Sequence, residues 1–180
     1  EAFDAATRVT VGHASHRLVG TDGWVEHDAL RRISMSVPAI PMSPVMKRRI
    51  TLPEHEFRSV QMLGIDPISR FQIAPVGRHD PVLFDPSELI AEPMTAVVNR
   101  TTAFELDVTI GSRIKVQSGA NIAELKIISL LPPAHLPGGL VNDVIFVDIA
   151  TAQEVLQVFD GVSYVDLRID NPTLETKLNR

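Results

Sequence analysis

The 180-residue sequence contains no cysteine, which excludes thiolate catalysis, zinc–cysteine sites and disulfide bonds. It also lacks the glycine patterns of P-loop and dinucleotide-binding turns, and the G-x-S-x-G elbow of serine hydrolases. No apolar stretch approaches the roughly 20 residues that a membrane-spanning helix needs. The sequence therefore offers no positive support for catalysis, and we expect no cofactor.

Positive charge is also scarce. Lys and Arg total 17 against 22 Asp and Glu, so the net charge is −5. Nucleic acids and anionic lipids attract proteins with clustered positive charge, so we expect neither as a partner. The tightest basic cluster, Lys47-Arg48-Arg49, borders an apolar stretch and is interpreted as strand-edge or solvent-facing charge. Hydrophobic residues make up 44% of the chain, enough for a folded core.

No residue spacing selects a metal site. His13 and His16 are three apart, but they lie in a stretch that alternates like a strand, where this spacing places two side chains on opposite faces. The polar triplet Glu54-His55-Glu56 consists of adjacent residues, whose side chains diverge. Paired carboxylates for acid–base chemistry are possible among 22 acidic residues, but no spacing identifies one pair.

The apolar pattern predicts a fold of the α+β class. The order of elements is β-α-β-β, then a β-rich insert, then β-α-β, as in a split sandwich with helices packed on one face of a sheet. The two strands that follow the first helix are close enough in sequence to form a hairpin, and Phe57 lies in the apolar run of the second of them. A further hairpin is predicted around the turn Ser118–Asn121, because apolar and polar residues alternate on both sides of it.

The last β-α-β unit begins with the continuous apolar run Val144–Val147, which is typical of a strand covered on both faces. Asp148 can cap the helix, and Thr151 with Glu154 offers a capping-box alternative one turn later. Phe159 is expected on the buried face of the helix, and Gly161 is expected to end it. In the final strand, Asp166 is expected to face solvent. The turn into the helix contains no glycine, so we expect it to hold no phosphate.

Three segments, in this order, resemble the extracytoplasmic core domain of MacB/FtsX-like ABC-transporter permeases. They are Leu63-Gly64-Ile65-Asp66-Pro67, which matches a strand ending in G-(I/V)-D-P, the helix-to-strand step from Ala103 to Val116, and Ile145–Gln153, which matches (V/I)-(F/Y)-V-D-(I/L)-x-x-A-Q. The resemblance covers roughly residues 9–170. Ser112 departs from it, because an acidic residue often follows this glycine in the family.

The resemblance implies an extracytoplasmic, periplasmic domain of a bacterial inner-membrane protein, held between the first and second of four membrane helices. It implies a porter-like α+β subdomain formed by residues 9–78 and 141–170, into which a small β-rich subdomain, residues 79–140, is inserted. Residues 1–8 and 171–180 would then be stalks that lead to the membrane helices.

The resemblance also implies a non-catalytic role. The domain would couple cytoplasmic ATP hydrolysis to export or extraction of an envelope substrate, or to mechanical signalling to a periplasmic partner. The implied partners are a cytoplasmic ABC ATPase reached through the membrane helices, a second permease subunit, and a periplasmic adaptor, lipoprotein or hydrolase. The alternative is a free-standing soluble α+β enzyme or small-ligand-binding protein. A scaffolding domain without an ATPase partner is a third possibility.

One loop stands out as a candidate contact surface. In the segment LPPAHLPGGL, the apolar residues Leu136 and Leu140 and the adjacent Pro137 lie among prolines and glycines. Apolar side chains in such a surface loop are expected to contact a partner. The alternative is that this loop packs back on its own domain.

Overall fold

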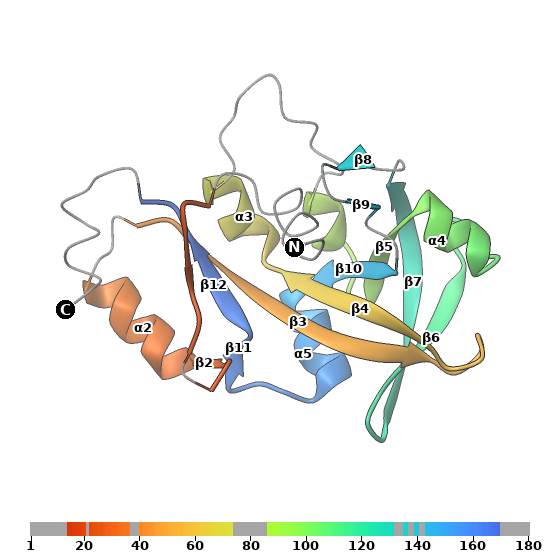
Figure 1. Cartoon of the computed structure of the whole chain (residues 1–180), viewed down its shortest axis with the longest axis horizontal. Coiled ribbons are helices and arrows are strands. Elements are labelled where there is room, and N and C mark those ends of the chain that lie inside the picture. Colours follow the sequence, from red (N-terminus) through yellow and green to blue (C-terminus); the bar gives the residue numbers. More distant parts are fainter. Residues whose placement is uncertain are drawn as a thin grey trace.

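The computed structural model describes residues 14–20, 22–36, 40–73, 86–131, 135–136, 139–140 and 143–169. Strands predominate in these ranges (Figure 1). The strands are β1 (His16–Leu18), β2 (Val25–Glu26), β3 (Met42–Leu52), β4 (Arg58–Ile65), β5 (Thr95–Asn99), β6 (Arg113–Ser118), β7 (Asn121–Leu131), β8 (His135–Leu136), β9 (Gly139–Leu140), β10 (Val144–Asp148), β11 (Gly161–Val162) and β12 (Tyr164–Leu167). The helices are α2 (His27–Ser36), α3 (Pro67–Ile73), the 3-10 helix η1 (Pro86–Leu89), α4 (Arg100–Glu105) and α5 (Ile149–Leu156).

Within the described residues, most strands join one sheet in the order β1-β12-β3-β4-β10-β5-β7-β6. The pairs β4–β10 and β5–β7 are parallel, and the other neighbours are antiparallel. The last strand, β6, also pairs with β3 through Thr51 and Gln117. This pairing closes the series from β3 to β6 into a barrel-like ring, and β12 and β1 extend the sheet beyond β3.

Both faces of the sheet are buried around β10. Along β10, Ile145 and Val147 belong to the larger core, which also contains residues of α5, whereas Val144 and Phe146 belong to the core on the opposite face. That second face is covered by η1 and α3, and Figure 1 shows α3 and α5 on either side of the β3 and β4 ribbons. The prediction of a strand covered on both faces is confirmed, because successive side chains of a strand point in opposite directions.

Helix α5 lies unusually close to β4. A Cβ atom built on Gly64 would lie 2.3 Å from Cβ of Ala152 and 3.1 Å from Cβ of Met46. Only a residue without a side chain fits in this position. The next residues of the same segment begin α3, because Oδ1 of Asp66 accepts a hydrogen bond from the Ile68 N–H at 3.1 Å and Pro67 occupies the first helical position.

The two ends of α5 differ in how well the sequence predicted them. Asp148 is the N-cap, and its Oδ1 accepts hydrogen bonds from the N–H groups of Ala150 at 2.9 Å and Thr151 at 3.0 Å, as predicted. The C-terminal prediction was wrong. The helix ends at Leu156, where Gln157 takes the left-handed conformation with φ of 55° and turns the chain. Phe159 therefore lies beyond the helix, and 60% of it is exposed.

Gly161 has a different role from the predicted helix stop. It lies in β11, and a Cβ atom there would lie 2.5 Å from Nε1 of Trp24 and 2.5 Å from the carbonyl oxygen of Val25. The glycine therefore permits close packing of β11 against the segment that enters β2.

The prediction that Asp166 faces solvent was also wrong. All of β12 is buried, because β1 pairs with its outer edge and β3 with its inner edge. Asp166 is 1% exposed, and its Oδ1 accepts a hydrogen bond from Nε of Arg17 at 2.8 Å. The guanidinium carbon of Arg17 also lies 3.9 Å from the ring centroid of Tyr164, a cation–π contact.

The predicted α+β class is confirmed by the mixture of helices and strands. Strands from both predicted subdomains hydrogen-bond in one sheet, because β10 lies between β4 and β5. The predicted hairpins β3–β4 and β6–β7 are present, the second turning at Ser118–Asn121. The division into a porter-like unit of residues 9–78 and 141–170 and an inserted subdomain of residues 79–140 stays a prediction.

Replacing Gly64 tests the contact between β4 and α5. We expect Gly64→Ala to lower the free energy of unfolding by about 2 kcal/mol, because the added methyl group overlaps Ala152. Urea titrations measure the loss of stability for Gly64→Ala, for Ala152→Gly and for the double variant. We expect the double variant to lose less than the sum of the two single losses, by about 1 kcal/mol or more, because removing the Ala152 methyl group makes room for the new one. The control replaces an exposed alanine of the same helix, Ala150→Gly, and its effect should simply add to that of Gly64→Ala. If the effects of Gly64→Ala and Ala152→Gly also simply add, the contact is contradicted.

Candidate functional site

The predicted contact loop is described in part. The backbones of Leu136 and Leu140 belong to two short antiparallel strands, β8 and β9, in which Leu136 pairs with Gly139 and Leu140 with His135. Pro137 lies outside the described residues. The segment is thus a small hairpin of its own, and its role as a contact surface stays a prediction.

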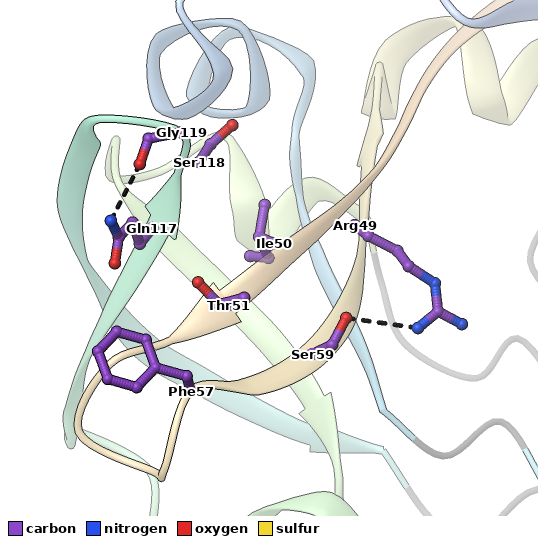
Figure 2. Close-up of a pocket in the computed structure, with 8 residues that line it drawn as sticks. All are labelled: Arg49, Ile50, Thr51, Phe57, Ser59, Gln117, Ser118 and Gly119. Carbon is purple, nitrogen blue, oxygen red and sulfur yellow. Dashed lines mark hydrogen bonds between the residues drawn. The ribbon is translucent and has the colours of Figure 1, made fainter.

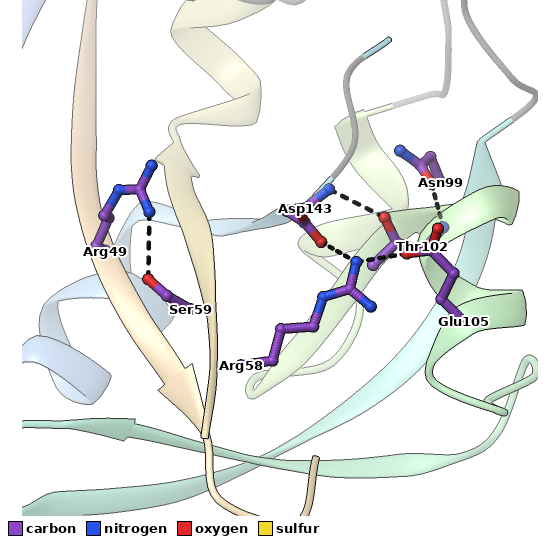
Figure 3. Close-up of polar contacts among 7 residues, drawn as sticks. All are labelled: Arg49, Arg58, Ser59, Asn99, Thr102, Glu105 and Asp143. Carbon is purple, nitrogen blue, oxygen red and sulfur yellow. Dashed lines mark hydrogen bonds and ion pairs between the residues drawn. The ribbon is translucent and has the colours of Figure 1, made fainter. Parts of the chain in front are cut away.

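An ion-pair cluster lies where the chain enters β10 from this segment (Figure 3). Arg58, the first residue of β4, bonds through Nη2 to carboxylate oxygens of both Glu105, at the end of α4, and Asp143. The Asp143 N–H donates to Oγ1 of Thr102 at 3.1 Å, and the Asp143 carbonyl accepts from the Gln61 N–H at 2.7 Å. These bonds tie three elements to one point.

The geometry of this cluster depends on its backbone. Asp143 has a positive φ of 58°, and Asn99 caps α4 through a hydrogen bond of 2.6 Å from the Thr102 N–H to Oδ1. The hydrogen bond to Glu105 is the largest cause that raises the pKa of the Arg58 guanidinium above its usual value, and Asp143 adds to it. The bonds of Arg58 to Glu105 and Asp143 make it an anchor for the start of β10.

A pocket of about 260 Å³ lies between the β3–β4 and β6–β7 hairpins, beside the pair Thr51–Gln117 that closes the ring. Figure 2 shows Arg49 and Ser59 on one side of it and Gln117 on the other, with Ile50 and Thr51 between them. Its lining is completed by Phe57, Ser118 and Gly119. The lining combines hydroxyl groups, an amide, a guanidinium and a phenyl ring, and it contains no carboxylate.

Sequence reasoning missed this pocket. Phe57 was expected in the apolar run of β4, but it lies before the strand and is 65% exposed. Glu56 and Phe57 both have positive φ, 52° and 54°, which is rare for residues with side chains. The left-handed turn directs the phenyl ring away from the core. The signal in the sequence was a bulky apolar residue directly after the polar triplet Glu54-His55-Glu56.

In the part of the chain that the structure describes, no histidine belongs to a cluster that could hold a metal ion. His16 is exposed in β1, and its Nδ1 lies 2.9 Å from Oγ of Ser15. His13 lies outside the described residues. Across the described ranges, no three His, Cys, Asp or Glu side chains are arranged to hold a metal ion. The described helices include none with the length and apolar character needed to cross a membrane.

No protein-family model matches the chain. Along 99% of its length the chain is 25% identical to an uncharacterised ABC transporter permease protein of Mycobacterium tuberculosis, and it spans 21% of that permease. Two solved structures have a similar fold. One is the extracellular domain of the noncanonic ABC-type transporter YknZ from Gram-positive bacteria, with a TM-score of 0.57 and 11% identity over 90% of this chain and 88% of that one. The other is the periplasmic region of MacB from Actinobacillus actinomycetemcomitans, with a TM-score of 0.56 and 11% identity over 96% of this chain and 83% of that one.

These comparisons confirm the resemblance that the sequence motifs indicated. The chain is similar to part of an ABC-transporter permease, and it has the fold of extracytoplasmic domains that lie outside the membrane in MacB and YknZ. The matched relative is a permease protein of an ABC transporter, and YknZ is an ABC-type transporter. The chain spans about a fifth of the length of the matched permease.

Replacing Arg58 tests its role as an anchor. We expect Arg58→Gln to lower the free energy of unfolding by about 1–2 kcal/mol, because two carboxylates lose their common partner. The control is Arg113→Gln, which removes a more exposed pair with Glu124 and should cost less than about 0.5 kcal/mol. Chemical denaturation measures both. Equal losses would show that the Arg58 cluster contributes no more than an ordinary surface pair.

Proposed function

We propose that this chain is the extracytoplasmic domain of an ABC-transporter permease subunit and that it transmits motion from a cytoplasmic ATPase to the cell envelope. The observation that supports this most strongly is the similarity of nearly the whole chain to one part of an ABC transporter permease. Outside the cytoplasmic membrane, this motion drives export or extraction of an envelope substrate, or it passes a mechanical signal to a periplasmic partner.

Transmission of motion requires a stiff body. The described sheet meets this requirement, because its strands close on themselves through β3 and β6 and helix α5 contacts β3, β4, β6, β7 and β10. Packed interiors of this kind deform little, so displacement at one edge is passed to the other.

The chain also enters and leaves this body at neighbouring positions. The first described strand, β1, pairs with the last, β12, in the register His16–Leu167 to Leu18–Val165. The ion pair between the exposed Arg17 and the buried Asp166 joins the same two strands. A domain held between two membrane helices receives force through both of its ends, and here both ends lead into one pair of strands.

The partners follow from this role. The ATPase acts through the membrane helices of the parent protein, and a second permease subunit completes the transporter. On the outer side, a periplasmic adaptor, a lipoprotein or a hydrolase receives the motion, and the β8–β9 hairpin with Leu136, Pro137 and Leu140 is the proposed contact surface. No nucleic acid is involved.

Distance measurements on the full-length parent with its ATPase test whether the domain moves as one body. This chain has no cysteine, so once any cysteines elsewhere in the parent are replaced by serine, spin labels can be attached at Phe104→Cys and Glu154→Cys, two exposed positions on α4 and α5. We expect the distance between the two labels within a domain to stay constant during ATP turnover, while the distance between Phe104→Cys labels of two permease subunits changes. A change within the domain, or no change between subunits, would contradict the proposal.

Charge placed on the β8–β9 hairpin tests the contact surface. We expect the double variant Leu136→Asp and Leu140→Asp to abolish transfer to the outer partner or substrate, because a desolvated contact does not tolerate buried carboxylates. Circular dichroism and the thermal midpoint of the domain should be unchanged. Unaltered transport by this variant in cells would remove the hairpin from the proposal.

A further inference from the structure

The charge beside the pocket of Figure 2 is unlike that on the neighbouring strands. Every basic residue of β4, β6 and β7 forms an ion pair with a carboxylate: Arg58 with Glu105 and Asp143, Arg113 with Glu124, Lys115 with Glu54, and Lys126 with Glu92. By contrast, among the described residues Arg49 forms no ion pair, and its Nη1 donates only to Oγ of Ser59 at 3.3 Å. An acidic protein thus leaves a guanidinium without a counter-charge at the edge of a pocket.

The rest of the pocket is suited to a short peptide. Thr51, Ser59, Ser118 and the Gln117 amide can donate or accept hydrogen bonds, as a peptide backbone requires. The exposed phenyl ring of Phe57 offers an apolar surface on the side opposite Arg49 and Ser59 (Figure 2). The polar and apolar parts are spread across the ends of two hairpins, so an elongated ligand contacts both and a compact ion does not.

We infer that this pocket binds a short, extended acidic segment of a partner protein. A carboxylate of the segment pairs with Arg49, an apolar side chain lies on Phe57, and the backbone between them bonds to the hydroxyl and amide groups. Charge complementarity selects this ligand, because Arg–carboxylate bonds are among the stronger polar contacts. A long polyanion, such as nucleic acid, would instead extend over the acidic remainder of the surface.

Binding here has a mechanical consequence. The pocket lies beside the register pair Thr51–Gln117, through which β6 and β3 close the ring. A segment that contacts Ser59 of β4 and Gln117 of β6 joins the two hairpins a second time. The site goes beyond the proposed transmission of motion, and it adds a way in which a partner stiffens the body that moves.

The probe is the fluorescein-labelled peptide Ser-Leu-Glu-Leu-Glu-Leu-Ser, titrated with the 180-residue chain at low ionic strength and followed by anisotropy. We expect saturable binding, at least about tenfold weaker binding of the matched peptide with Gln in place of Glu, and loss of about tenfold in affinity for Arg49→Ala and for Phe57→Ala. The wild-type thermal midpoint should rise with peptide, because the ligand binds the folded state.

Two matched control variants separate the pocket from general charge and apolarity. Arg48→Ala removes the same charge from the adjacent exposed residue, whose side chain lies on the opposite face of β3 and does not line the pocket. Phe104→Ala removes a phenyl group that is 87% exposed on α4. Both should change the affinity by less than about threefold, as screened or distant groups do.

Several results would overturn the inference. They are the absence of saturable binding, equal binding of the Glu and Gln peptides, or equal effects of Arg48→Ala and Arg49→Ala. Phosphatidylglycerol vesicles are titrated in parallel, and vesicle binding that Arg49→Ala abolishes, without peptide binding, would assign the pocket to lipid instead. None of these results bears on the distance measurements between subunits, so failure here leaves the proposed transmission of motion intact.

Discussion

The close contact between β4 and α5 determines how the rest of the domain is arranged. Gly64 and Ala152 meet there with no room for a further methyl group, and they come from segments far apart in the sequence. Both belong to motifs that carry the resemblance to MacB/FtsX-like permeases, G-I-D-P on one side and V-D-I-x-x-A-Q on the other. The depth at which α5 lies against β4 also determines its contacts with β3, β6 and β7, so the barrel-like ring is built around this contact.

Local pattern predicted local structure well. The closeness of two strands in sequence predicted the β3–β4 hairpin, and alternation of apolar residues predicted the β6–β7 hairpin. The continuous run Val144–Val147 indicated burial on both faces, and Asp148 was named as a candidate helix cap. The order of strands was not accessible in this way. Asp166 looks solvent-facing from alternation alone, and it is buried because β1, more than a hundred residues earlier, pairs beside it and supplies Arg17. Likewise, nothing local to Phe57 reveals the left-handed turn that exposes it.

Two arginines of the β3–β4 hairpin, Arg58 and Arg49, differ in how their charges are paired. Arg58 is held by two carboxylates and by the bonds of Asp143 to Thr102 and Gln61, so its charge is used inside the fold to fix the start of β10. Arg49, nine residues earlier on the paired strand, bonds to one hydroxyl group and keeps its charge available at the rim. A charge that is paired within the domain holds the fold, whereas a charge without a carboxylate partner is the kind that can pair with another molecule.

The β10–α5 junction shows why a strand–helix unit can serve a structural purpose. In nucleotide-binding folds, the N–H groups at this kind of junction are left open to a phosphate by glycines. Here the carboxylate of Asp148 accepts from both Ala150 and Thr151, so these donors are already satisfied within the chain. The hydroxyl of Thr151 in turn accepts a hydrogen bond from the N–H of Met94 at 3.1 Å. Met94 directly precedes β5, so this bond ties the helix to that strand. The junction that elsewhere binds a ligand is thus used to hold one helix against the sheet, and this is the property that transmission of force requires.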